Sequence, residues 1–143
     1  MNPWTAVLQS VHSALIDELT DRHPDPKPEL GLPVRQSGYV LPEPGLSSVL
    51  VCELELVGTR GILLIASEPG FGRALKLGPE ELWSAILKRA GGEFARRGIQ
   101  PAFYSPLNVV GGGPLPKHLP IPGRLVWIPF SIPGGRCFLG MGV

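Results

Sequence analysis

The strongest constraint on the fold is a pair of adjacent apolar segments separated by a short turn. Residues 48–57 alternate in a period-two pattern, with Leu50, Cys52, Leu54 and Leu56 on one side and Val49, Val51, Glu53 and Glu55 on the other. This pattern is typical of a strand with one buried face. Gly58-Thr59 indicates a tight turn, and residues 61–66 are a continuous apolar run. We therefore expect an antiparallel hairpin, with Glu53 and Glu55 on its outer face.

Two longer segments have the periodicity of helices. Asn2-Pro3 is a typical N-cap followed by proline, and apolar residues then recur at helical spacing to about residue 20. The polar face of this helix includes Glu18. A second helix begins after Gly78-Pro79 and ends at Arg97-Gly98. Its interior contains Gly91-Gly92, which costs roughly 1 kcal/mol per residue relative to alanine, so we expect a close backbone approach there.

The remaining segments complete the predicted architecture. Residues 22–44 are a proline-rich connector that admits only short edge strands. A short helix is expected over 69–75 and short strands over 102–104, 107–110, 124–130 and 136–143, the last two forming a second hairpin. The order predicts an α+β fold, an α/β two-layer arrangement with a mostly antiparallel sheet and two long helices packed on one face. The length of 143 residues fits a single domain over 1–143.

Composition and motifs exclude several classes of function. The formal net charge of +1 gives no global field for nucleic acid, and we expect no nucleic-acid partner. The apolar runs are too short to span a bilayer and the N-terminus lacks a signal-peptide pattern, so we expect no membrane association and a cytoplasmic protein. Cys52 and Cys137 have no metal-ligand spacing and read as buried thiols. Residues 111–113 lack a following Gly-Lys-Ser/Thr, which argues against a phosphate-binding loop. From the cysteine spacing and this loop together, we expect neither a metal nor a cofactor.

The most concentrated charge of the chain lies on the second long helix. It comprises Lys88, Arg89, Arg96 and Arg97. One interpretation is a solvated helix face whose cations favour the C-terminal end of the macrodipole. The other is a docking patch for an acidic partner.

Several residue runs, taken in order, resemble one known family. They are the strand 61–65, the short helix 69–75, the helix start Glu81-Leu82-Trp83-Ser84-Ala85-Ile86, the segment 105–112 and the closing strands 125–130 and 137–143. Together with the first helix, this order resembles the chemotaxis phosphatases of the CheX and CheC type, which are related to the middle domain of a flagellar switch protein. The resemblance covers nearly the whole chain and rests on order rather than on one diagnostic motif.

The resemblance implies a specific chemistry that this sequence lacks. In that family a phosphorylated response regulator docks on the long helix, where a Glu-x-x-Asn pair removes the aspartyl phosphate. We align the pair with Lys88 and Gly91, which supply neither the carboxylate nor the amide. Starting instead from Glu93 puts Arg96 at the amide position. We therefore assign no catalytic residue, with Glu93 as the fallback.

Three functional hypotheses follow. The leading one is a non-catalytic CheX-like signalling or motility module that contacts a response regulator receiver domain, or another assembly protein, through Trp83, Lys88, Arg89 and Glu93. The second is an aspartyl-phosphate phosphatase with a rearranged site that uses Glu93 or Glu81. The third is a dimerising structural module, in which the strand 137–143 forms an uncapped sheet edge and pairs with a second copy.

Overall fold

The computed structural model describes residues 2–23, 27–46, 48–110, 117–120 and 123–142. Three helices and eight strands form the α+β fold that the sequence predicts. In chain order the elements are α1 (Pro3–Arg22), β1 (Glu29–Leu30), β2 (Val34–Ser37), β3 (Ser48–Leu56), β4 (Thr59–Ser67), α2 (Pro69–Leu75), α3 (Pro79–Arg97), β5 (Ala102–Phe103), β6 (Leu107–Val110), β7 (Arg124–Ile132) and β8 (Gly135–Gly142). None of the helices in these residues is long and apolar enough to cross a membrane.

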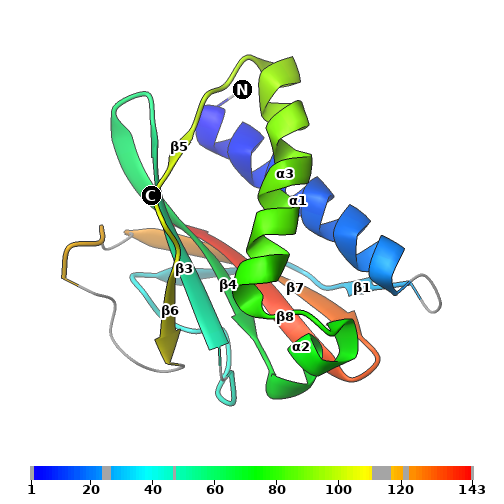
Figure 1. Ribbon diagram of the computed structural model, residues 1–143. Coiled ribbons are helices and arrows are strands. Elements are labelled where there is room, and N and C mark those ends of the chain that lie inside the picture. Colours follow the sequence, from blue (N-terminus) through cyan, green and yellow to red (C-terminus); the bar gives the residue numbers. More distant parts are fainter. Residues whose placement is uncertain (1, 24–26, 47, 111–116, 121–122, 143) are drawn as a thin grey trace.

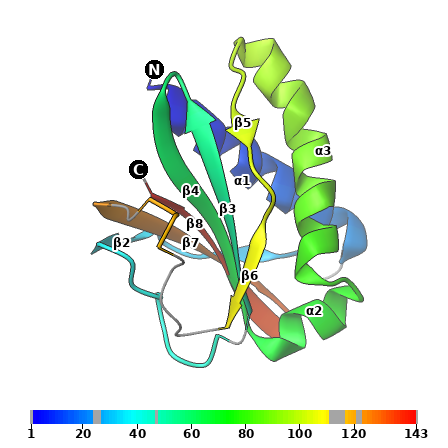
Figure 2. The same cartoon turned by 60° about the vertical axis from the view of Figure 1, so that its left-hand side comes forward.

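All strands belong to one antiparallel sheet, and the two long helices cover one of its faces (Figure 1; Figure 2). The strand order is β1-β7-β8-β4-β3-β5, with β2 also paired to β7 and β6 to β3. The proline-rich connector thus contributes only β1 and β2, as predicted. The expectation of an open edge at 137–143 is wrong, because β8 lies between β4 and β7 and is hydrogen-bonded on both sides.

The β3–β4 hairpin has continuous register from Ser48 opposite Ser67 to Leu56 opposite Thr59. Its turn therefore consists of Val57 and Gly58, one residue earlier than predicted. Both have positive φ, 51° and 74° respectively. Two-residue hairpin turns with this conformation match the right-handed twist of the strands. Val57 adopts the conformation although a β-branched side chain disfavours it.

A first hydrophobic core fills the space between the helices and the sheet. It joins α1 residues such as Val11 and Leu15, α3 residues such as Ile86 and Phe94, and Leu139 of β8. The i, i+3 and i, i+4 spacing of these helical residues puts them on one side of each helix, so each helix buries a single stripe. This core fixes α1 and α3 side by side on the sheet.

A second core covers the opposite sheet face, so β3 is buried on both faces and not on one face as its alternation predicts. It includes Val49, Leu64 and Trp127, against which Tyr39 and Leu41 of the connector pack. The indole Nε1 of Trp127 donates a hydrogen bond to the backbone oxygen of Val40, 2.9 Å away. The connector therefore packs on this sheet face and covers part of the second core.

Because both sheet faces are covered, Glu53 of β3 is buried. The sequence pattern put it on a solvent-facing side, but it is only 8% exposed. Arg60 of the neighbouring strand donates a hydrogen bond from Nε to its carboxylate at 2.6 Å. Because a buried carboxylate needs such a partner, Glu53 and Arg60 form a structural ion pair across the hairpin.

The helix ends follow the predicted chemistry. The side chain of Asn2 accepts a hydrogen bond from the Trp4 amide at 2.9 Å and caps α1. Gly98 ends α3 in the left-handed conformation, with φ of 68°. Within the described residues the expected backbone approach at Gly91 and Gly92 is absent, because a Cβ added at either position would meet none of their atoms within 4 Å.

Candidate functional site

The exposed face of α3 is the candidate site, and Trp83 is not part of it. Trp83 was expected on a docking surface, but it is only 3% exposed. Its ring packs edge-on against that of Phe103, with 6.0 Å between centroids, and Phe94 stacks on the same ring at 5.9 Å. Trp83 falls on the buried stripe because it follows Leu82 and precedes Ile86 by three residues. It anchors α3 to the sheet.

Arg89, the second expected docking residue, is engaged within the fold. Its Nε donates a hydrogen bond to Glu18 of α1 at 2.6 Å, and another of its nitrogens donates to Asp21. Arg22 binds the other oxygen of Glu18 at 2.8 Å. Glu18 itself is buried, which corrects its assignment to a polar helix face. We call Glu18, Asp21, Arg22 and Arg89 the α1–α3 clamp.

The clamp also determines the protonation of its members. Burial raises the pKa of the Glu18 carboxyl, but the hydrogen bonds from Arg22 and Arg89 outweigh burial, so its pKa lies below the ordinary value. The hydrogen bonds from Arg89 to Asp21 and to Glu18 raise the guanidinium pKa. The charge of Arg89 is thus largely compensated, and it holds the two helices together.

Glu93 is compensated in the same way. It forms an ion pair with Arg96 and a longer one with Arg97, in which Nε and Oε2 are 3.7 Å apart. Arg97 also donates a hydrogen bond to Gln9 of α1 at 3.0 Å. These contacts occupy the carboxylate that was the fallback for catalysis, and they account for Arg96 and Arg97 as partners within the fold.

Lys88, Gly91 and Gly92 lie close together on the exposed face of α3. All three are exposed, and within the described residues Lys88 forms no ion pair. A cation next to two glycines gives a positively charged surface with little side-chain bulk, on which another backbone can approach closely. We call these three residues the α3 patch.

Glu81 is the remaining acid considered for chemistry. Its Oε1 accepts a long hydrogen bond of 3.4 Å from the amide of Gly78 and so caps the start of α3. Ser84 follows at i+3 and is exposed, as Glu81 is. Residues at this spacing lie on the same helical face, one turn apart. Glu81 and Ser84 therefore form the only acid and hydroxyl pair with this spacing on α3.

The two thiols are unsuited to chemistry in this fold. Cys52 and Cys137 are free and buried, as the sequence predicts. Burial raises the pKa of the Cys52 thiol to about 12 and that of Cys137 beyond the ordinary range. In the described part of the chain no group of three or more His, Cys, Asp or Glu side chains could hold a metal ion. The glycine run at 111–113 lies outside the described residues.

The architecture has close counterparts among solved structures. A CheC-like superfamily protein from Shewanella sp. PV-4 superposes with a TM-score of 0.72 at 16% identity, covering 99% of this chain and 98% of that one. The chemotaxis protein CheX from Vibrio vulnificus superposes with a TM-score of 0.70 at 16% identity, covering 95% and 97%. This chain has the CheC/CheX-like fold.

A third neighbour with the CheC/CheX-like fold was crystallised with another protein. It is the CheX of a CheX–CheY–BeF3–Mg²⁺ complex from Borrelia burgdorferi, with a TM-score of 0.56, 14% identity and coverage of 94% and 96%. At these identities the likeness extends to the fold. No protein-family model and no curated protein matches the sequence.

Sequence reasoning missed the α1–α3 clamp, although part of its signal was present. Glu18 and Arg22 have the i, i+4 spacing of a helical ion pair. The pairing with Arg89 depends on how α1 crosses α3, and no local pattern encodes that crossing. Of the four expected docking residues, the structure leaves only Lys88 exposed and uncompensated.

Proposed function

We propose that this chain is a non-catalytic signalling module that docks on a response regulator receiver domain through the α3 patch. The observation that carries the proposal is the open space over Gly91 and Gly92. Each glycine costs helix stability, and no atom of the described fold uses the space that it leaves. Docking of a partner on α3 would use that space.

Charge supports the same partner class. Lys88 is the uncompensated cation of the α3 patch, whereas Arg89, Arg96 and Arg97 are paired with carboxylates. A receiver domain presents an acidic face around its phosphorylated aspartate, so an exposed lysine would favour the encounter. The CheX–CheY complex of Borrelia burgdorferi is a precedent for a partnership of this kind in the same fold.

The geometry opposes catalysis at the positions that the resemblance implies. Lys88 and Gly91 supply neither a carboxylate nor an amide, and the carboxylate of Glu93 binds two arginines. A water-activating site needs an acid or amide that is free to contact the substrate. We therefore infer binding without dephosphorylation.

A binding experiment tests this proposal. Lys88→Glu should weaken association with a phosphorylated receiver domain by about tenfold or more, because it reverses the charge that faces the partner. Lys117→Glu is the matched control, since Lys117 is also exposed but lies outside α3. Arg89→Glu is unsuitable, because it would break the α1–α3 clamp. Equal affinities for the Lys88 and Lys117 variants would contradict docking on α3.

A phosphatase that uses Glu81 and Ser84 is the second candidate, because both residues are exposed at i, i+3 spacing. The decay of phosphate from the labelled receiver separates the two functions. A half-life that the protein leaves unchanged supports the non-catalytic module. Faster decay that Glu81→Gln abolishes, while Glu29→Gln retains it, would establish the phosphatase, since Glu29 is an exposed glutamate of β1, outside α3.

A further inference from the structure

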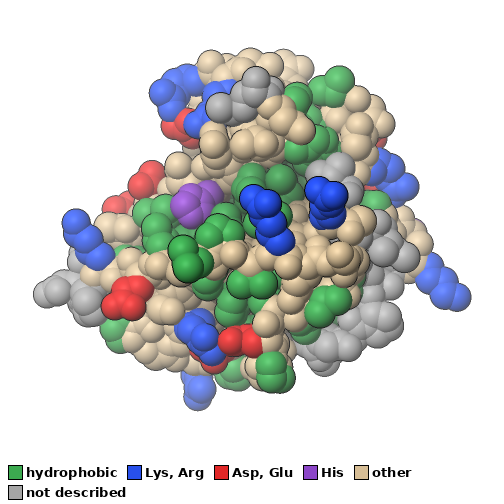
Figure 3. Space-filling view, turned by 180° about the vertical axis from the view of Figure 1, so that it is seen from behind, with side chains coloured by type: hydrophobic (Ala, Val, Ile, Leu, Met, Phe, Trp, Pro, Cys, Tyr) green, Lys and Arg blue, Asp and Glu red, His purple; other side chains and the backbone are tan. Residues whose placement is uncertain are grey.

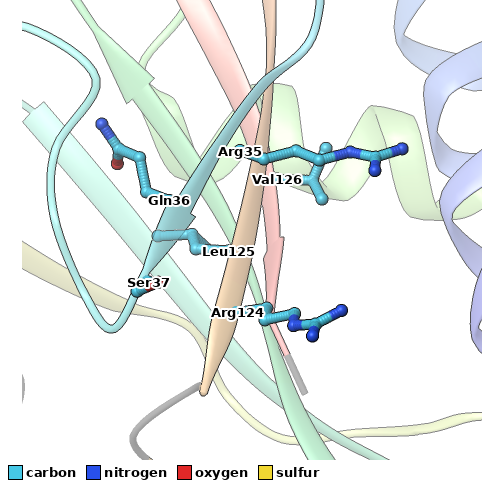
Figure 4. A pocket seen from close by; sticks show the side chains of 6 residues that line it. All are labelled: Arg35, Gln36, Ser37, Arg124, Leu125 and Val126. Carbon is cyan, nitrogen blue, oxygen red and sulfur yellow. The ribbon is translucent and has the colours of Figure 1, made fainter.

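A hollow of about 360 Å³ lies on the β2–β7 pair and is lined by two arginines. Its lining comprises Arg35, Gln36 and Ser37 of β2 and Arg124, Leu125 and Val126 of β7. Figure 4 shows that the side chains of Arg35 and Arg124 extend to the same side of the two strands, whereas Gln36 points to the other side. The volume lies within the range of small-molecule sites.

The strand register explains why the two arginines share a face. Arg35 is opposite Val126, and Ser37 is opposite Arg124. Arg35 and Arg124 are therefore diagonal neighbours, about 7–8 Å apart along the sheet. At this separation two guanidinium groups can reach one ligand, and each offers planar, bidentate donors to an oxyanion.

Neither arginine has a compensating charge. Within the described residues no ion pair or hydrogen bond involves the side chain of Arg35 or Arg124. The sequence explains part of this, because β2 contains no acidic residue and no Asp or Glu occurs anywhere from residue 94 to residue 143. On the face opposite to that of Figure 1, neighbouring basic side chains lie near the centre with hydrophobic and neutral surface around them (Figure 3).

We propose that this hollow binds the phosphate group of a small organic phosphate. Two adjacent arginines without a nearby acid repel each other. An oxyanion with two negative charges between them would remove that repulsion and accept hydrogen bonds from both guanidinium groups. Val126 lies on the same strand face as Arg124 and supplies apolar surface beside the charges for the organic part. The site is separate from the α3 patch, because its lining residues lie on β2 and β7, and it does not depend on the proposed docking function.

Calorimetric titration at low ionic strength tests the proposal with three probes: adenosine monophosphate, orthophosphate and adenosine. Adenosine monophosphate should bind saturably, and Arg35→Gln or Arg124→Gln should each weaken it by about tenfold or more. Arg73→Gln, which removes an equal exposed charge from α2, should leave the affinity unchanged. Tighter binding of adenosine monophosphate than of orthophosphate supports an organic ligand. Equal affinities for adenosine monophosphate and orthophosphate would overturn the organic part of the proposal and make free phosphate the ligand.

Further measurements distinguish variants that lose the binding site from variants that lose the fold. Both arginines are exposed and unpaired, so their glutamine variants should unfold at the same temperature as the parent without ligand. Arg124→Lys keeps the charge but loses the planar fork, so its affinity should fall between those of the parent and Arg124→Gln. Absence of saturable binding, equal weakening by Arg73→Gln, or equally tight binding of adenosine would overturn the proposal.

Discussion

Gly91 and Gly92 should destabilise this protein when it is unbound. Both lie in the interior of α3 with helical backbone, and a Cβ at either position would meet no atom of the described part of the chain within 4 Å. Alanine at such a site gains roughly 0.5–1 kcal/mol from helix propensity and from reduced freedom of the unfolded chain. Because adjacent helix positions do not face each other, the double variant should gain about 1–2 kcal/mol.

Urea and thermal unfolding measure this gain directly. The double variant should raise the free energy of unfolding by that amount and the melting temperature by about 2–8 °C. Gly61→Ala is the control, because its Cβ would lie 2.6 Å from the ring of Trp4 and 2.8 Å from the oxygen of Gly142, and it should destabilise. A loss of stability in the double variant would refute the reasoning, since it would mean that the fold itself uses these glycines.

Docking on the α3 patch adds a second expectation for the same variants. Two methyl groups would occupy the space that a partner backbone is proposed to use. The double variant should therefore bind a receiver domain more weakly although it is more stable. Undiminished binding would remove Gly91 and Gly92 from the docking surface.

Three further predictions concern residues away from the α3 patch. Glu18→Gln should lower the free energy of unfolding by about 1–2 kcal/mol at neutral pH, because Arg22 and Arg89 lose the carboxylate that they bind. The fold lowers the pKa of Glu18, so its contribution to stability is present above the unfolded value of 4.5 and is lost as the pH falls through the lower folded pKa. In urea titrations, the difference in unfolding free energy between parent and variant should therefore be smaller at about pH 3 than at about pH 7. The same difference at both pH values would contradict the clamp. Cys52 and Cys137 should resist iodoacetamide in the folded protein at about pH 8 and react after unfolding, because burial raises both thiol pKa values. Mass spectrometry measures the labelling, and rapid labelling of the folded chain would contradict that burial. Val57→Asn should raise the free energy of unfolding by about 0.5–1 kcal/mol, since asparagine tolerates the φ of 51° at this turn better than a β-branched residue. An unchanged midpoint of urea unfolding would argue against backbone strain at Val57.

Local sequence patterns predicted most elements of the fold but only part of the candidate site. The caps at Asn2 and Gly98 delimit their helices as expected, because capping chemistry acts within one turn. Lys88 and Gly91 are on the exposed face of α3, as helical periodicity requires. Trp83 was misplaced, although its i, i+3 spacing to Ile86 puts it on the buried stripe; only its contact with Phe103 of β5 depends on the tertiary structure.

The clamp and the arginine hollow could not be predicted, because each joins residues that are distant in sequence. Glu18 meets Arg89 only through the crossing of α1 and α3, and Arg35 meets Arg124 only through the register of β2 on β7. The free energy of such pairings depends on burial and on competing charges in the assembled fold.

The sequence by itself determined the two long helices, the β3–β4 hairpin and the α+β class, because periodicity, turns and caps are encoded within a few residues. Only the tertiary structure decided the sheet order that encloses β8, the burial of the second sheet face beneath the connector, and which charged residues remain free. The physical reason is that strand order and charge compensation are set by non-local contacts, whose partners no local pattern specifies.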